Sequence, residues 1–148
     1  NYDDYDPLAS GRWERNSTAT VESKRGQKFL RELESALLAL PQKQLVAGSF
    51  CEVWPAEHPE DTDQVEACAL GALMWFRGVK PPDWMNDPYE IEDFGRDESV
   101  YEASALLDMA FTLAWNIIDR NDQGFREEPE QRYQRMLTWV QKNIKRDA

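Results

Sequence analysis

Apolar residues recur every three or four positions in four segments of the chain, and this period constrains the fold more than any other feature. The clearest segment spans residues 23–40, from a serine suited to the helix N-cap to the residue before Pro41. The others span 63–78, 99–120 and 129–144. Such a period places apolar side chains on one face of an α-helix, so we predict four amphipathic helices.

Residue types at the ends of these segments agree with helix boundaries. Asp63 with Glu66, and Ser99 with Glu102, match the capping box, in which the two side chains satisfy the first free N–H groups of a helix. Gly78 suits the C-terminal cap of the second helix, because glycine adopts the left-handed conformation without steric cost. We therefore expect the second and third helices to begin at these capping boxes.

The predicted core consists of the apolar stripes of the four helices, supported by an apolar content of 41% in 148 residues. The stripes are Phe29, Leu30, Leu33, Leu37 and Leu40; Val65, Cys68, Ala69, Ala72, Leu73 and Phe76; Ala103, Leu106, Leu107, Ala110, Phe111, Ala114, Ile117 and Ile118; and Tyr133, Met136, Leu137, Val140 and Ile144.

The stretches between the helices complete the predicted architecture. Residues 1–22 are polar and form an N-terminal arm. The runs 45–46 and 50–54, around Gly48, are interpreted as one or two short strands. We predict a mainly α fold: a single-domain helical bundle of about four helices over residues 23–148, with a short irregular or β segment.

Negative charge is distributed unevenly along the chain. The net charge is −11, and more than half of the 28 Asp and Glu residues fall in the stretches 3–6, 52–66 and 83–98, which contain Arg96 as their only Lys or Arg. A chain of this charge is a poor ligand for nucleic acid or anionic lipid, and no apolar run is long enough to span a membrane. We expect neither direct nucleic-acid binding nor membrane binding, and instead a protein partner with a basic surface.

The stretch 83–98 combines carboxylates with aromatic residues and is the predicted partner-binding surface. A loop folded over the core is the alternative interpretation of the same residues. The candidate binding residues are Asp83, Trp84, Asp87, Tyr89, Glu90, Glu92, Asp93, Asp97 and Glu98.

Basic residues gather on two of the predicted helices. The opening turns of the first helix carry one cluster, and the outer face of the last helix carries a second. We interpret the first cluster as a solvated face, with an interaction surface as the alternative. The clusters are Lys24, Arg25, Lys28 and Arg31, and Arg132, Arg135, Lys142, Lys145 and Arg146.

Residues that carry catalysis are sparse, so we predict no enzyme activity, no cofactor and no metal site. The single histidine, His58, lies in an acidic loop without an identifiable nucleophile nearby. Cys51 and Cys68 leave a disulfide open, but two free thiols in the core of a cytoplasmic protein are the simpler interpretation. The acidic first residues do not resemble a signal peptide.

One stretch matches the spacing of an EF-hand calcium loop. Asp119, Asn121, Gln123, Gly124 and Glu130 occupy positions 1, 3, 5, 6 and 12. The glutamine is longer than the usual ligand at position 5, and Pro129 fits the first turn of the next helix. A glycine-containing turn between two helices explains the same residues, and the sequence leaves calcium binding open.

Three motifs resemble a family of small phage and prophage proteins that is uncharacterised. The first is Lys24–Leu33 followed by Ala36-Leu37 and Leu40-Pro41; the second is Cys68–Leu73 with Arg77-Gly78; the third is Asn121-Asp122 ahead of Pro129–Arg132 and Trp139-Val140. The resemblance spans residues 24–144, and the acidic insert near 52–62 and the Tyr/Asp-rich start depart from it. It implies a protein made in the cytoplasm of a bacterial host and assigns no active site.

The leading functional hypothesis is an acidic, non-catalytic phage-type protein that binds and inhibits a host protein. Counter-defence, in which carboxylates stand in for nucleic-acid phosphates on an anti-CRISPR or anti-restriction target, is one concrete form. The alternative is a self-associating structural or virion protein, with homo-oligomers formed through the apolar faces of the last two helices. A carboxylate-based metalloenzyme acting with Cys68 is the third hypothesis.

Overall fold

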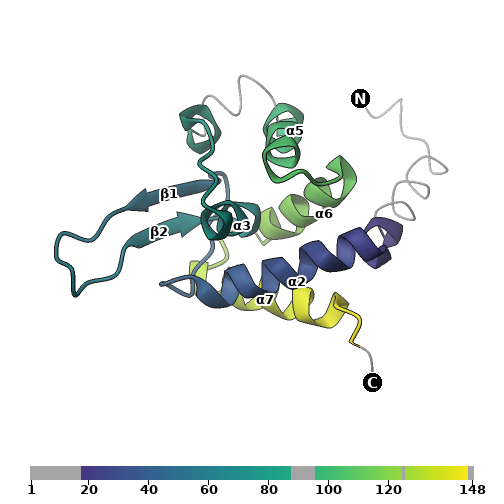
Figure 1. The fold of residues 1–148 in the computed structure, drawn as a ribbon, viewed down its shortest axis with the longest axis horizontal. Helices are drawn as coiled ribbons and strands as arrows, with labels where there is room; N and C mark the ends of the chain where they lie inside the picture. The colour runs from purple at the N-terminus through teal and green to yellow at the C-terminus, as the bar shows by residue number, and fades with distance from the viewer. Residues whose placement is uncertain (1–17, 88–95, 125, 147–148) are drawn as a thin grey trace.

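The computed structural model describes residues 18–87, 96–124 and 126–146, and this part of the chain is mainly helical (Figure 1). It contains α2 (Lys24–Ala39), α3 (Ala69–Arg77), α5 (Arg96–Leu107), α6 (Phe111–Asp122), α7 (Pro129–Asn143), the 3₁₀ helix η2 (Asp83–Asn86), and strands β1 (Cys51–Trp54) and β2 (Gln64–Ala67). The prediction of a mainly α fold with a short β segment is confirmed.

Helices α2 and α7 lie side by side and run in opposite directions (Figure 1). Every apolar residue predicted for the stripes of these two helices is buried. Buried polar groups fix their pairing. The Tyr133 hydroxyl donates to the Leu37 carbonyl at 2.8 Å, and the Gln27 amide donates to the Asn143 carbonyl and accepts from the Lys145 N–H.

The first helix begins where its cap predicts. The Ser23 hydroxyl accepts a hydrogen bond from the Gly26 N–H at 3.0 Å, which satisfies a free donor of the first turn. Of the predicted N-terminal arm, residues 1–17 lie outside the described part of the chain. Residues 18–22 are helical, and Val21 within them is buried in the core.

The second helix begins later than its predicted capping box. Residues 64–67 form β2, and α3 starts at Ala69 with Cys68 as its N-cap, whose Sγ accepts from the Gly71 N–H at 3.4 Å. The interpretation of Asp63 and Glu66 as a capping box was therefore wrong. The reason is a two-residue period: the two apolar residues of β2 are buried, and its two polar residues are exposed.

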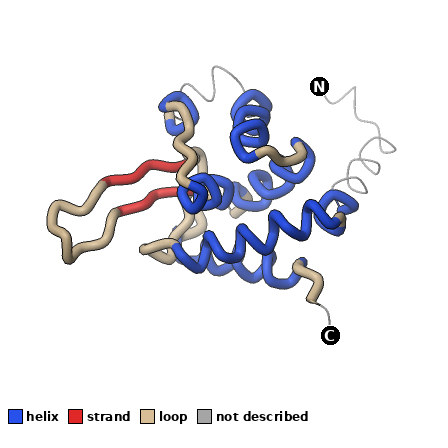
Figure 2. Tube along the Cα trace, in the orientation of Figure 1, coloured by secondary structure: helices blue, strands red, loops and turns tan. Residues whose placement is uncertain are grey.

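Strands β1 and β2 form an antiparallel hairpin that projects from the helical body (Figure 2). The predicted strand at 50–54 is confirmed over Cys51–Trp54 and pairs with β2, whereas the run at 45–46 is not a strand. This run contacts the hairpin through a single backbone hydrogen bond among the described residues, from the Val46 N–H to the Ala67 carbonyl at 2.9 Å. The second acidic stretch, 52–66, is therefore this hairpin.

The predicted long helix 99–120 is two helices, α5 and α6. Asp108 adopts a left-handed φ of 51°, and the Met109 N–H donates to the Ser104 carbonyl at 3.0 Å. This is the usual closure of a helix C-terminus, with an aspartate where glycine is more common. Because α5 starts at Arg96, the capping-box interpretation of Ser99 and Glu102 was also wrong.

Arg132 was wrongly placed on the exposed basic face of α7: it is 5% exposed. Its guanidinium donates to backbone carbonyls within residues 121–124, the end of α6 and the start of the turn that leads to α7. Arg135 donates to the same turn and to the Glu127 carboxylate at 2.9 Å. The hydrogen bond from Arg135 holds the pKa of Glu127 below its usual range. These two arginines therefore stabilise the turn.

The residues of the EF-hand match build this same turn. Asn121 lies in α6 with its side chain fully buried, donating to the Val46 carbonyl and accepting from the Ala69 N–H, both at 2.9 Å. Gly124 has a φ of 82°, and Glu130 lies in the first turn of α7. A glycine-containing turn between two helices accounts for the pattern.

Candidate functional site

The structure separates the predicted partner-binding residues into two places and leaves some undescribed. Asp83 and Asp87 lie in and beside η2, with Asp83 exposed, while Trp84 packs partly against the core. Asp97 and Glu98 are exposed in the first turn of α5. Tyr89, Glu90, Glu92 and Asp93 lie outside the described residues.

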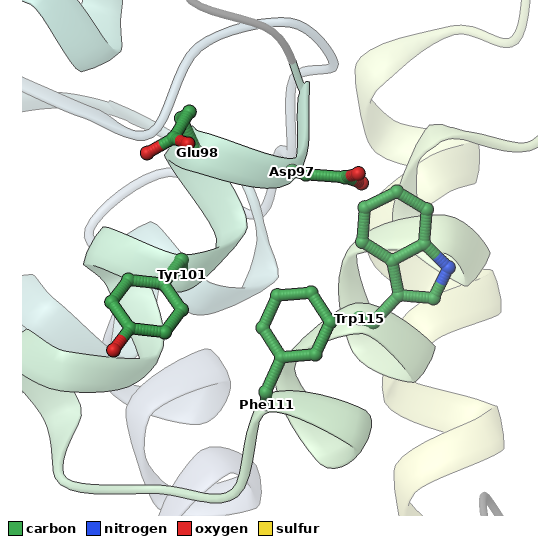
Figure 3. Close-up of a pocket in the computed structure, with 5 residues that line it drawn as sticks. All are labelled: Asp97, Glu98, Tyr101, Phe111 and Trp115. Atoms are coloured by element: carbon green, nitrogen blue, oxygen red, sulfur yellow. The ribbon is translucent and has the colours of Figure 1, made fainter.

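Asp97 and Glu98 border an open groove between α5 and α6, shown in Figure 3. We call it the aromatic groove; its lining residues are Asp97, Glu98, Tyr101, Phe111 and Trp115, and its volume is about 500 Å³. The Phe111 and Trp115 rings are stacked, with centroids 6.0 Å apart, and Tyr101 and Phe111 are tilted at 6.4 Å. Tyr101 is 64% exposed and Phe111 39%.

The turn at Asp108 creates this groove. It folds α6 back against α5, so that Phe111, the first residue of α6, comes close to Tyr101. Trp115 follows Phe111 by four residues, and Tyr101 follows Asp97 by four, so each pair shares one helix face. Figure 3 shows the Asp97 side chain directed towards the Trp115 ring.

The aromatic groove suits a cationic side chain. Aromatic faces attract an arginine or lysine within about 6 Å of the ring, and carboxylates add charge-assisted hydrogen bonds. Asp97 and Glu98 also lie at the helix N-terminus, where the helix dipole favours negative charge. The groove therefore combines apolar contact area with a negative potential.

Sequence reasoning missed the three aromatic residues of the groove. Phe111 was assigned to the buried stripe of one continuous helix, which the turn at Asp108 interrupts. The available signal was the aspartate between Leu107 and Met109, a residue type that tolerates a left-handed φ.

The residues considered for catalysis are poorly suited to it. His58 is exposed in the connection between β1 and β2. Both cysteines are buried and free. Burial, with a smaller contribution from Glu52, raises the pKa of Cys51 to about 11, and burial, with Asp122, raises the pKa of Cys68 to about 12. Because the thiolate is the nucleophile, burial and the raised pKa values make both cysteines unsuited to nucleophilic catalysis at neutral pH.

We expect both thiols to resist alkylation in the folded protein. At pH 8, iodoacetamide should label Cys51 and Cys68 at least about tenfold more slowly than in denaturant, because burial keeps them protonated and shielded. Mass spectrometry of the intact protein measures the labelling. Rapid labelling of the folded chain would contradict the buried positions of the thiols.

Across the described residues, no group of three or more His, Cys, Asp or Glu side chains is placed to hold a metal ion. None of the described helices is long and apolar enough to cross a membrane. Comparison with known protein families, with curated proteins and with solved structures found no match.

Proposed function

We propose that the protein is a non-catalytic binding protein that uses the aromatic groove to recognise a basic surface of another protein. The observation that supports this most strongly is the exposed Tyr101 and Phe111 pair beside two carboxylates. Binding energy in protein interfaces is concentrated in aromatic and arginine residues, and interfaces pair surfaces of opposite charge.

We further propose that the partner is a host protein whose basic surface ordinarily holds nucleic acid, in the cytoplasm of a bacterial host. The resemblance to phage and prophage proteins and the net charge of −11 support this form. Inhibition would then follow from occupancy, with carboxylates at positions that phosphates otherwise take, as in a counter-defence factor.

The other hypotheses have less support. Self-association through the apolar faces of the last two helices would need those faces to be available, but Leu113, Ile117, Met136 and Val140 are buried within the chain. A metalloenzyme would need clustered ligands, which the described residues do not supply.

Affinity capture from a nuclease-treated bacterial lysate tests the proposal. We expect D97N/E98Q to bind its captured partner about tenfold more weakly than wild type, mainly through a slower association rate at low salt. Y101A should weaken binding by about 1–3 kcal/mol, because it removes an exposed aromatic contact. Surface plasmon resonance with the purified partner measures both effects.

A matched control neutralises two carboxylates elsewhere. Glu57 and Glu60 are exposed in the connection between the strands, so E57Q/E60Q changes the net charge by the same amount. This control should retain wild-type affinity. Equal affinity of wild type, D97N/E98Q and Y101A would exclude the aromatic groove as the binding surface. If E57Q/E60Q lost as much affinity as D97N/E98Q, the loss would reflect the net charge of the protein and not the groove.

A further inference from the structure

The two strands of the hairpin each have an outer edge that faces away from the other strand. In an antiparallel pair, the backbone groups of alternate residues point towards the partner strand. The Cys68 N–H donates to the Phe50 carbonyl at 3.0 Å, so the Phe50 carbonyl and the backbone groups of Glu52 face the second strand. The backbone groups of Cys51 and Val53 therefore face outward.

The outer edge of β2 is covered by the chain itself. Gln42 accepts from the Val65 N–H at 3.0 Å and donates to the Asp63 carbonyl at 3.1 Å. Further along, the Val46 N–H donates to the Ala67 carbonyl at 2.9 Å. A side-chain amide and a backbone amide thus take the place of a neighbouring strand.

Asn86 covers the start of the outer edge of β1, where its side-chain oxygen accepts from the Phe50 N–H at 3.0 Å. The Asn86 side chain accepts from the Cys51 N–H and donates to the Cys51 carbonyl, both at 2.8 Å, as a residue of a neighbouring strand would. Two residues further on, neither the N–H nor the carbonyl of Val53 has a hydrogen-bond partner within the described part of the chain. Pro55 then ends the edge, because it has no N–H.

A hollow of about 680 Å³ lies beside this open edge, between β1, the end of α3 and η2. Trp54 is 46% exposed and Val53 42% exposed at its border, and Trp75 is half-buried within it. The hollow therefore offers apolar contacts next to unpaired backbone groups, which is the arrangement that binds an added strand.

Charge around the edge favours a basic segment. Glu52, Asp83 and Asp87 line the hollow, and Lys80 is the one cation among its lining residues in the described chain. Glu52 also lies directly opposite Glu66 in the strand register. Like charges at opposed positions destabilise a hairpin, so a cation beside them on the same face would stabilise it.

We propose that the outer edge of β1 accepts an extended, basic segment of a partner protein as an added strand. Val53 exchanges two backbone hydrogen bonds with this segment, and a lysine or arginine of the segment lies beside Glu52, on the face of the hairpin that also carries Glu66 and Trp54. The Asn86 amide sets where the added strand ends. This site is separate from the aromatic groove and does not depend on it.

The experiment uses a synthetic peptide of alternating lysine and valine, with a glutamate–valine peptide of the same length as its control. We expect the lysine peptide to slow amide exchange of Val53 at least about tenfold, measured by NMR, because its N–H becomes hydrogen-bonded. The glutamate peptide should leave the exchange rate unchanged. A lysine peptide with alternate backbone nitrogens methylated should lose binding, since it cannot pair with the edge.

Two variants of the protein separate backbone pairing from charge. V53P removes the outward N–H without touching the bonds to β2, and E52Q/E66Q removes the opposed charges. Each should weaken binding of the lysine peptide about tenfold or more, while D97N/E98Q should not. Cross-strand contacts between residues 52 and 66 in NMR spectra show whether V53P keeps the hairpin.

Three results would overturn the proposal. The first is equal binding of the lysine and glutamate peptides. The second is an unchanged Val53 exchange rate at saturating lysine peptide. The third is protection of Val53 that rises with protein concentration in the absence of peptide, which would identify a second copy of this chain as the occupant of the edge.

Discussion

G71A should lower the free energy of unfolding by about 3 kcal/mol, although alanine is ordinarily the better helix former by about 1 kcal/mol. A Cβ at Gly71 would lie 1.5 Å from the Phe50 carbonyl oxygen and 2.4 Å from its carbon. Those are backbone atoms at the start of the hairpin, and they cannot move aside as a flexible side chain can. To admit the methyl group, α3 must separate from the hairpin.

Urea unfolding followed by circular dichroism measures this loss, with G48A as the matched control. Gly48 has a φ of 82°, and nothing lies within 4 Å of a Cβ built there. G48A therefore carries only the cost of a left-handed alanine, about 1–2 kcal/mol. Equal losses of unfolding free energy in G71A and G48A would show that the Phe50 carbonyl moves to admit the methyl group and that the contact with α3 is not rigid.

The close approach at Gly71 illustrates which parts of this fold a sequence reveals. The three-to-four-residue period of the segments that form α2 and α7 located the buried faces of these two helices correctly. These are local signals, since each helix face is encoded within a few turns. That the hairpin is what packs against Gly71 depends on the fold of the whole chain.

Errors in the predicted elements arose where a local signal was short or ambiguous. Residues 64–67 give only two alternations before α3 begins, and the polar residues around them imitate a capping box. The turn at Asp108 interrupts an apolar pattern that continues in helical register on both sides. One left-handed aspartate thus decides whether Phe111 is part of the core or of the aromatic groove.

The two side-chain amides that organise the hairpin left no recognisable pattern in the sequence. Asn86 and Gln42 each pair with an outer strand edge, from positions distant along the chain. Nothing local distinguishes them from other polar loop residues. The open edge at Val53 was equally hidden, because an edge is defined by which neighbours are absent.

N121A should destabilise the protein by about 2–6 kcal/mol, because the Asn121 amide links three separate segments of the core. Asn121 is fully buried, and it accepts from the Ala69 N–H at the start of α3 and donates to the Val46 carbonyl. Alanine leaves both groups without a partner, at a cost of about 1–3 kcal/mol each. N143A is the matched control, since within the described residues the Asn143 side chain donates only to the Trp139 carbonyl one turn away.

A second substitution at this position, N121D, should make the stability of the protein depend on pH. In N121D the introduced carboxyl is buried beside Asp122 and the Val46 carbonyl, so its folded-state pKa should lie above its unfolded value. A group with a raised folded pKa loses stability as pH rises, so N121D should approach wild-type stability in acid and fall below it near neutrality. Urea midpoints from pH 3 to 7, relative to wild type at each pH, measure this. A difference independent of pH would mean that the introduced carboxyl reaches solvent and that position 121 is not sealed within the core.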